Sequence, residues 1–254
     1  MRIGGQSLEG IHGLHVSGTG VTARVVEYQW NMSPQDSRLL NEQIDALRRG
    51  KVRTPEASNL TARIRSRMSN YVNQPACRSL SALAIAEITI AADAPPGERE
   101  IRVLTSRGPS NPMAFDVGQV PETARPPMKT SAKQILGKEY LALRKRPAEE
   151  AEVRVTLPCT MNGQIASGEI NSYRFTATKG QRLVAALRAR QLVPYIADAV
   201  PGWFQPVLKL CDAKGAEVAY AADYRFRPDP VLLCELPADG AYVLTVQARV
   251  FRGP

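Results

Sequence analysis

The chain has 254 residues, 44% of them hydrophobic, which is enough for one large or two modest domains with packed cores. No run of 18 apolar residues occurs, and the first residues lack the apolar core of a signal peptide, so we expect no membrane span and no leader. The net charge is +9, but the basic residues are not interleaved with aromatic side chains that stack bases, so we expect no nucleic-acid partner.

The N-terminal part alternates apolar and polar residues. The stretch 13–28 predicts two strands around a turn at Gly18 and Gly20, because glycine is the residue that turns tolerate best. Alternation returns in 84–118, where short strands are separated by the turns "APPG" and "SRGPSN". This rhythm is typical of an antiparallel sheet protein.

Between these strand regions the apolar period changes to that of a helix. Ser33 is followed by Pro34, which is the order expected for a helix cap and first turn, and Gly50 is placed to end that helix. A second helix is predicted from Glu56 to about Asn73. We therefore expect an α-helical hairpin inserted at about 33–80.

The second half resumes the β pattern after a proline-rich and charged stretch. Residues 119–152 are predicted to be a linker with one short helix at about 134–143, and 153–254 to be all β. Turns that close on Gly97, Gly215 and Gly240 are interpreted as hairpin connectors. The last strand, after Gly240, has no later partner in sequence, so we expect an open edge there and a chain that is a segment of a longer protein.

The chain holds four cysteines without C-x-x-C spacing, which argues against a zinc ribbon or a dense disulfide framework. We expect free thiols that serve as small buried hydrophobes. Cys211 and Cys234 end two apolar runs and could instead face each other on neighbouring strands.

The sequence shows no complete reaction centre. His12 and His15 are the only histidines, and no further metal ligands or serine nucleophile lie near them in the pattern, so we expect neither a metal site nor a hydrolase triad. The glycines of "NGQIASG" are not followed by the G-K-[ST] of a phosphate-binding loop.

Two segments, 192–206 and 221–230, combine aromatic, arginine and aspartate residues and are predicted to be loops at one end of a sheet domain. The alternative is structural: the aromatic residues plug the core and the arginine pairs with an aspartate to hold the loops. Calcium is a second open alternative, because aspartates in these segments and Asp212 could supply oxygen ligands. The predicted binding residues are Tyr195, Asp198, Trp203, Phe204, Asp223, Arg225 and Asp229.

Two family resemblances follow from longer motifs. The first part, with "APPGEREIRVLTSRGPSNPMAFDVG", resembles an IPT/TIG-type immunoglobulin-like domain, from which the helical insert departs. The second part, with "INSYRFTATKGQRLVAAL", "PVLKLCDAKGAEVAY" and "ELPADGAYVLTV", resembles a bacterial pre-peptidase C-terminal domain. The pair is similar to pieces of the secreted multidomain proteins of Planctomycetes-type bacteria.

The resemblance implies a mainly β fold of two antiparallel β-sandwich domains, immunoglobulin-like and then jelly-roll-like. Their expected ranges are 1–118, with the helical insert, and 153–254, without the family's last strand. It further implies a secreted or periplasmic, non-catalytic accessory module that attaches to protein, carbohydrate or another cell-surface polymer and to neighbouring domains. The alternative function is an architectural spacer in a larger secreted peptidase or other enzyme. A third hypothesis is an autonomous intracellular hydrolase, which would require turnover by this chain alone. No cofactor is expected, apart from the calcium alternative.

Overall fold

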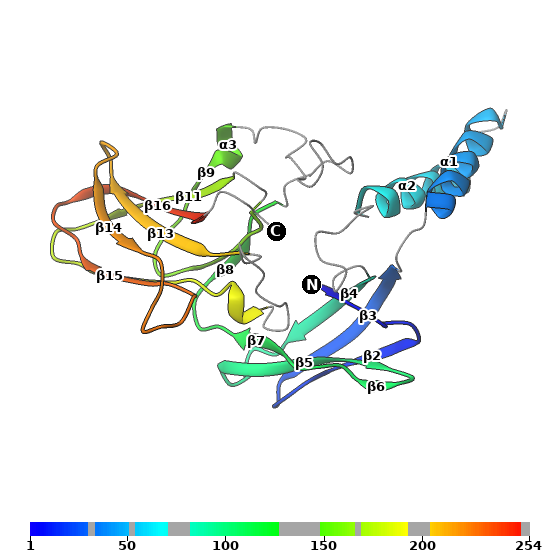
Figure 1. Cartoon of the computed structure of the whole chain (residues 1–254), viewed down its shortest axis with the longest axis horizontal. Coiled ribbons are helices and arrows are strands. Elements are labelled where there is room, and N and C mark those ends of the chain that lie inside the picture. The colour runs from blue at the N-terminus through cyan, green and yellow to red at the C-terminus, as the bar shows by residue number, and fades with distance from the viewer. Residues whose placement is uncertain are drawn as a thin grey trace. The chain divides into compact units, whose positions relative to one another are not determined.

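The computed structural model describes residues 1–29, 34–50, 54–70, 82–126, 148–165, 169–192 and 204–249 (Figure 1). It divides into two compact units, one of Met1–Pro95 with Arg99–Phe115 and the other of Asp116–Pro254 with Pro96–Glu98. Strands joined into several mostly antiparallel sheets dominate both, which confirms the predicted mainly β fold class.

The elements of the N-terminal part are two helices and seven strands among the described residues. The helices are α1 (Pro34–Arg49) and α2 (Pro55–Asn70). The strands are β1 (Arg2–Gly5), β2 (Ile11–Val16), β3 (Val21–Gln29), β4 (Ala82–Ile90), β5 (Gly97–Thr105), β6 (Gly108–Pro109) and β7 (Met113–Val117).

The first unit is built around a core shared by two sheets. One sheet has the order β1-β4-β3; in the other, β5 pairs with β2, β6 and β7. Ile3 and Ala84 from the first sheet and Val16, Ile101 and Val103 from the second are all buried in one cluster. Alternate residues of each strand therefore face the core, as the two-residue period of a strand requires.

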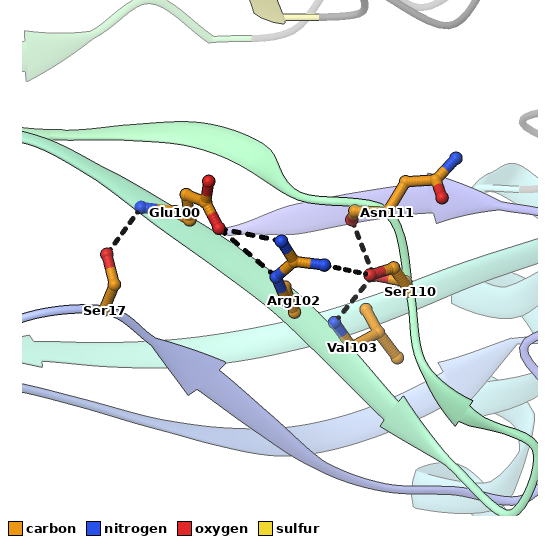
Figure 2. Close-up of polar contacts among 6 residues, drawn as sticks. All are labelled: Ser17, Glu100, Arg102, Val103, Ser110 and Asn111. Carbon is orange, nitrogen blue, oxygen red and sulfur yellow. Dashed lines mark hydrogen bonds and ion pairs between the residues drawn. The ribbon is translucent and has the colours of Figure 1, made fainter.

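Polar contacts hold β5 to its neighbours (Figure 2). The Ser17 hydroxyl accepts a hydrogen bond from the Glu100 amide at 2.8 Å, and the Arg102 guanidinium binds the Glu100 carboxylate at 2.9 Å and the Ser110 carbonyl at 3.1 Å. The Ser110 hydroxyl in turn accepts from the Val103 amide at 3.0 Å. The serine of the "SNP" motif thus supports the strand edge.

A helical hairpin is inserted between β3 and β4, as the sequence predicts. The hydroxyl of Thr54 accepts a hydrogen bond from the Ala57 amide at 3.2 Å, so Thr54 caps α2. Ile44 and Ile64 are buried, whereas Leu39 is 51% exposed. The buried face of the helical hairpin is therefore narrower than the spacing of its apolar residues predicts. Ser33 lies outside the described residues.

The second part of the chain contains nine described strands, a short helix and a 3-10 turn. The helical pieces are α3 (Ala148–Ala151) and η2 (Arg190–Leu192). The strands are β8 (Glu122–Ala124), β9 (Glu152–Arg154), β10 (Thr160–Asn162), β11 (Ile170–Ala177), β12 (Arg182–Ala186), β13 (Pro206–Asp212), β14 (Glu217–Ala221), β15 (Val231–Glu235) and β16 (Gly240–Ala248).

The second core lies between a five-stranded sheet of order β14-β13-β16-β11-β9 and the two-stranded sheet β12-β15. Phe175 and Leu210 come from the large sheet, and Leu183 and Leu232 from the small one, and all four are buried in the same cluster. The Phe175 ring stacks on Tyr242 with 6.0 Å between ring centroids. β14 and β15 each lie at an end of their sheet.

Part of the range predicted as a linker belongs to this second unit. β8 pairs in parallel with β10, although it lies within 119–152. Arg125, next to β8, is only 5% exposed and stacks over the Tyr173 ring at 5.4 Å. Proline-rich composition concealed this short strand. The helix predicted at about 134–143 lies outside the described residues.

The prediction of an open edge at the last strand is wrong. β16 lies inside the five-stranded sheet, paired with β11 on one side and β13 on the other. Its partners precede it by tens of residues in the sequence. An open edge was inferred because no strand pattern follows β16, but pairing depends on neighbours in space.

The interpretation of all three glycine turns as hairpin connectors is also wrong for two of them. The Gly215 turn joins the paired strands β13 and β14 and is a hairpin, with φ of +85° at the glycine. The Gly97 and Gly240 turns also place positive φ at glycine, but each joins strands of different sheets. Cys211 and Cys234 also lie in different sheets, and both are free thiols.

Candidate functional site

An open hollow of about 450 Å³ lies between β14 and β15, the end strands of the two sheets of the second unit. In Figure 1 both strands are orange, and the loop that joins them is drawn below them. The hollow is lined by Ala219, Tyr220, Ala221, Ala222, Asp223, Tyr224, Val231, Leu232 and Leu233. Asp223, one of the predicted binding residues, is the one charged residue in this lining.

The loop between these strands contains a tight turn whose central residues are Arg225 and Phe226. The Tyr224 amide donates to the Arg227 carbonyl at 3.0 Å, and the Arg227 amide donates back to the Tyr224 carbonyl at 2.9 Å. The φ angles of Arg225 and Phe226 are +49° and +65°, so both adopt the left-handed region. Positive φ at both central residues defines a type I′ turn, which normally contains asparagine and glycine.

The side chains of this turn extend into solvent. Phe226 has a relative exposure of 106%, so its ring gains no burial from the fold. The guanidinium of Arg225 lies 5.2 Å from the centre of the Tyr224 ring, a cation–π contact. The fold therefore presents an aromatic ring and a cation together at the apex of a turn.

Asp229 holds a loop in place, as the structural alternative predicts, but through partners that this alternative did not name. Its carboxylate accepts hydrogen bonds from the amides of Arg190 at 2.8 Å and Gln191 at 2.9 Å, the first residues of η2. The prediction that Arg225 pairs with an aspartate does not hold for Asp229, which is bound to these amides. Asp229 thus fixes a short helical turn.

Phe204 is 6% exposed and lies two residues before β13, so it is part of the buried structure, as expected if the aromatic residues plug the core. Its carbonyl accepts a hydrogen bond from the Arg190 guanidinium at 3.3 Å. Tyr195, Asp198 and Trp203 lie outside the described residues. Of the predicted set, the structure places Asp223 and Arg225 at the hollow and its adjoining turn.

An exposed apolar surface on the small sheet adjoins the hollow. Val184 of β12 lies opposite Leu233 of β15, and their exposures are 64% and 58%. Leu232, the residue before Leu233 on β15, is 2% exposed and faces the core. Sequence reasoning missed Leu233 because the run "VLLC" is apolar on both faces, and it missed the turn at Phe226 because that turn contains no glycine.

No group of three or more potential metal-ligating side chains occurs within the described ranges. The carboxylate of Asp212 accepts the amides of Lys214 at 2.8 Å and Ala216 at 2.9 Å. Calcium binding stays a prediction. His12 and His15 are both exposed on β2.

Burial raises the pKa of the Cys234 thiol, which keeps it protonated and weakly nucleophilic at neutral pH.

None of the helices in the described parts of the chain has the length and apolar character that a membrane crossing requires. Neither a protein-family model nor a curated protein sequence matches this chain.

Proposed function

We propose that this chain is a non-catalytic binding module of a secreted or periplasmic multidomain protein. It attaches to a protein or a cell-surface polymer through the hollow between β14 and β15 and the turn at its end. The observation that carries the proposal is the fully exposed Phe226 ring at the apex of a strained turn.

The strain at this turn supports a binding role. A non-glycine residue in the left-handed region costs about 1–2 kcal/mol, and here two adjacent residues adopt it. The Phe226 ring returns none of this cost through packing, because it is exposed. Strained backbone that a fold retains without a local benefit is typical of ligand-binding positions. Aromatic and arginine side chains are also the residue types enriched where binding energy concentrates.

We propose for the fold that each unit is an antiparallel β-sandwich, the first immunoglobulin-like and the second jelly-roll-like. The supporting observation is that buried residues from two separate sheets meet in one core in each unit. In a sandwich, loops at one end gather into a binding surface. The loop that carries Arg225 and Phe226 fits such a position.

The function is tested with the full chain as bait against two defined probes, a phage-displayed random dodecapeptide library and an array of bacterial cell-surface glycans. We expect a reproducible ligand whose affinity falls at least tenfold in F226A. The matched control is V26A, because Val26 is also exposed, at 55%, but lies in the first unit. If neither probe yields a ligand, the chain is an architectural spacer. If a ligand is found but F226A binds it as well as V26A does, the turn at Phe226 is not part of the binding site.

A further inference from the structure

The second edge of β15 has no partner strand among the described residues. In an antiparallel pair, only alternate residues direct their backbone groups to the partner. The Leu236 amide donates to Gln181 at 2.9 Å and the Leu187 amide to Pro230 at 3.0 Å, so the even-numbered residues of β15 bond to β12. Val231 and Leu233 therefore direct their amide and carbonyl groups away from β12.

This edge coincides with the hollow, since Val231 and Leu233 both line it. An extended backbone placed along β15 satisfies the free amide and carbonyl groups, and its alternate side chains enter the hollow. The hollow, of about 450 Å³, is open to solvent, and the apolar residues Val231 and Leu233 lie along its β15 side. The other side chains of the added strand lie beside the exposed Leu233, which in turn lies opposite the exposed Val184 of β12.

We propose that β15 binds an extended peptide segment of a partner protein by strand addition. The segment places apolar side chains beside Val231 and Leu233 in the hollow. Main-chain hydrogen bonds supply affinity in this binding mode, and pockets for alternate side chains supply specificity. The proposal deepens the function proposed above and rests on it, because it names the partner class of the same site.

The test uses dodecapeptides selected from the random phage library on the full chain, with affinity measured by fluorescence polarisation. We expect the selected peptides to alternate apolar residues and to lack a central proline. Methylating single peptide amides should weaken binding at least tenfold at every second position of the paired stretch. Equal sensitivity along that stretch, or none, overturns strand addition.

The matched protein variants are L233P and L233V. Proline is tolerated where a strand's amide faces away from the ladder, so L233P keeps the β12 bonds but removes a donor at the free edge. We expect L233P to lose at least tenfold in affinity and L233V to change it less than threefold. Where L233P fails to fold, the peptide methylation series decides instead.

The outcomes separate the two proposals. Loss of binding in F226A with unchanged binding in L233P supports a binding module but overturns strand addition. Loss in L233P with unchanged binding in F226A supports strand addition and removes the turn from the proposed function. A library that yields no peptide, or a chain that retains only glycans, overturns the peptide proposal.

Discussion

Replacing Phe226 by glycine should make the second unit more stable. The residue has φ of +65°, and its ring is fully exposed. The left-handed conformation therefore raises the free energy of the native state, and no side-chain burial offsets this cost. Glycine adopts this region without the steric conflict of a Cβ atom. F226G therefore relieves strain and removes no buried contact.

The expected magnitude follows from two opposing effects. Relief of the left-handed conformation contributes about 1–2 kcal/mol. The greater freedom of glycine in the unfolded chain offsets about 0.5–1 kcal/mol of that gain. The net increase in the free energy of unfolding is at most about 1.5 kcal/mol, with a midpoint of about 0.75 kcal/mol, which corresponds to a rise of about 1.5–3 °C in the melting temperature for a unit of this size.

Urea and thermal unfolding, followed by circular dichroism, measure this change. F226A is the matched control, because it removes the ring but keeps a Cβ atom at positive φ, and its free energy of unfolding should stay within about 0.5 kcal/mol of the wild type. A loss of more than 1 kcal/mol in F226A would show that the ring packs in the native state, and a destabilised F226G would refute the assignment of strain.

Three further predictions concern the second unit. L232A should lower the free energy of unfolding by about 2–5 kcal/mol in urea titrations, whereas L233A should change it by about 0.5 kcal/mol or less, because only Leu232 faces the core. D229A should cost about 1–2 kcal/mol by the same measurement, since it leaves the two η2 amides without their carboxylate acceptor. The hydrogen bond from Arg174 lowers the pKa of Glu152 in the folded chain below its value in the unfolded chain. The pair therefore stabilises the fold at any pH above the Glu152 pKa of the unfolded state. This contribution disappears as the pH falls through the Glu152 pKa of the folded state. E152Q should therefore flatten the fall of the unfolding midpoint below about pH 4.5, and an unchanged slope would show that the pair contributes nothing measurable.

The candidate site was predictable only in part. The loop with Asp223 and Arg225 was identified from its aromatic, arginine and aspartate content. Its left-handed turn was missed, because neither central residue is glycine or asparagine, the residues by which such turns are recognised. The role of Asp229 was also hidden, because its partners on η2 are distant in sequence and come close only in the folded unit.

Local patterns in the sequence determined the mainly β class, the two inserted helices and the glycines at positive φ, because each depends on residues close together in the chain. Strand neighbours were decided by the tertiary structure. The alternation around Tyr242 shows which side of β16 faces a core, but the same pattern fits an edge or a central strand. Pairing depends on backbone groups brought together from distant segments. For the same reason only the folded unit shows that Leu233 has an exposed side chain and lies on a strand edge without a partner among the described residues.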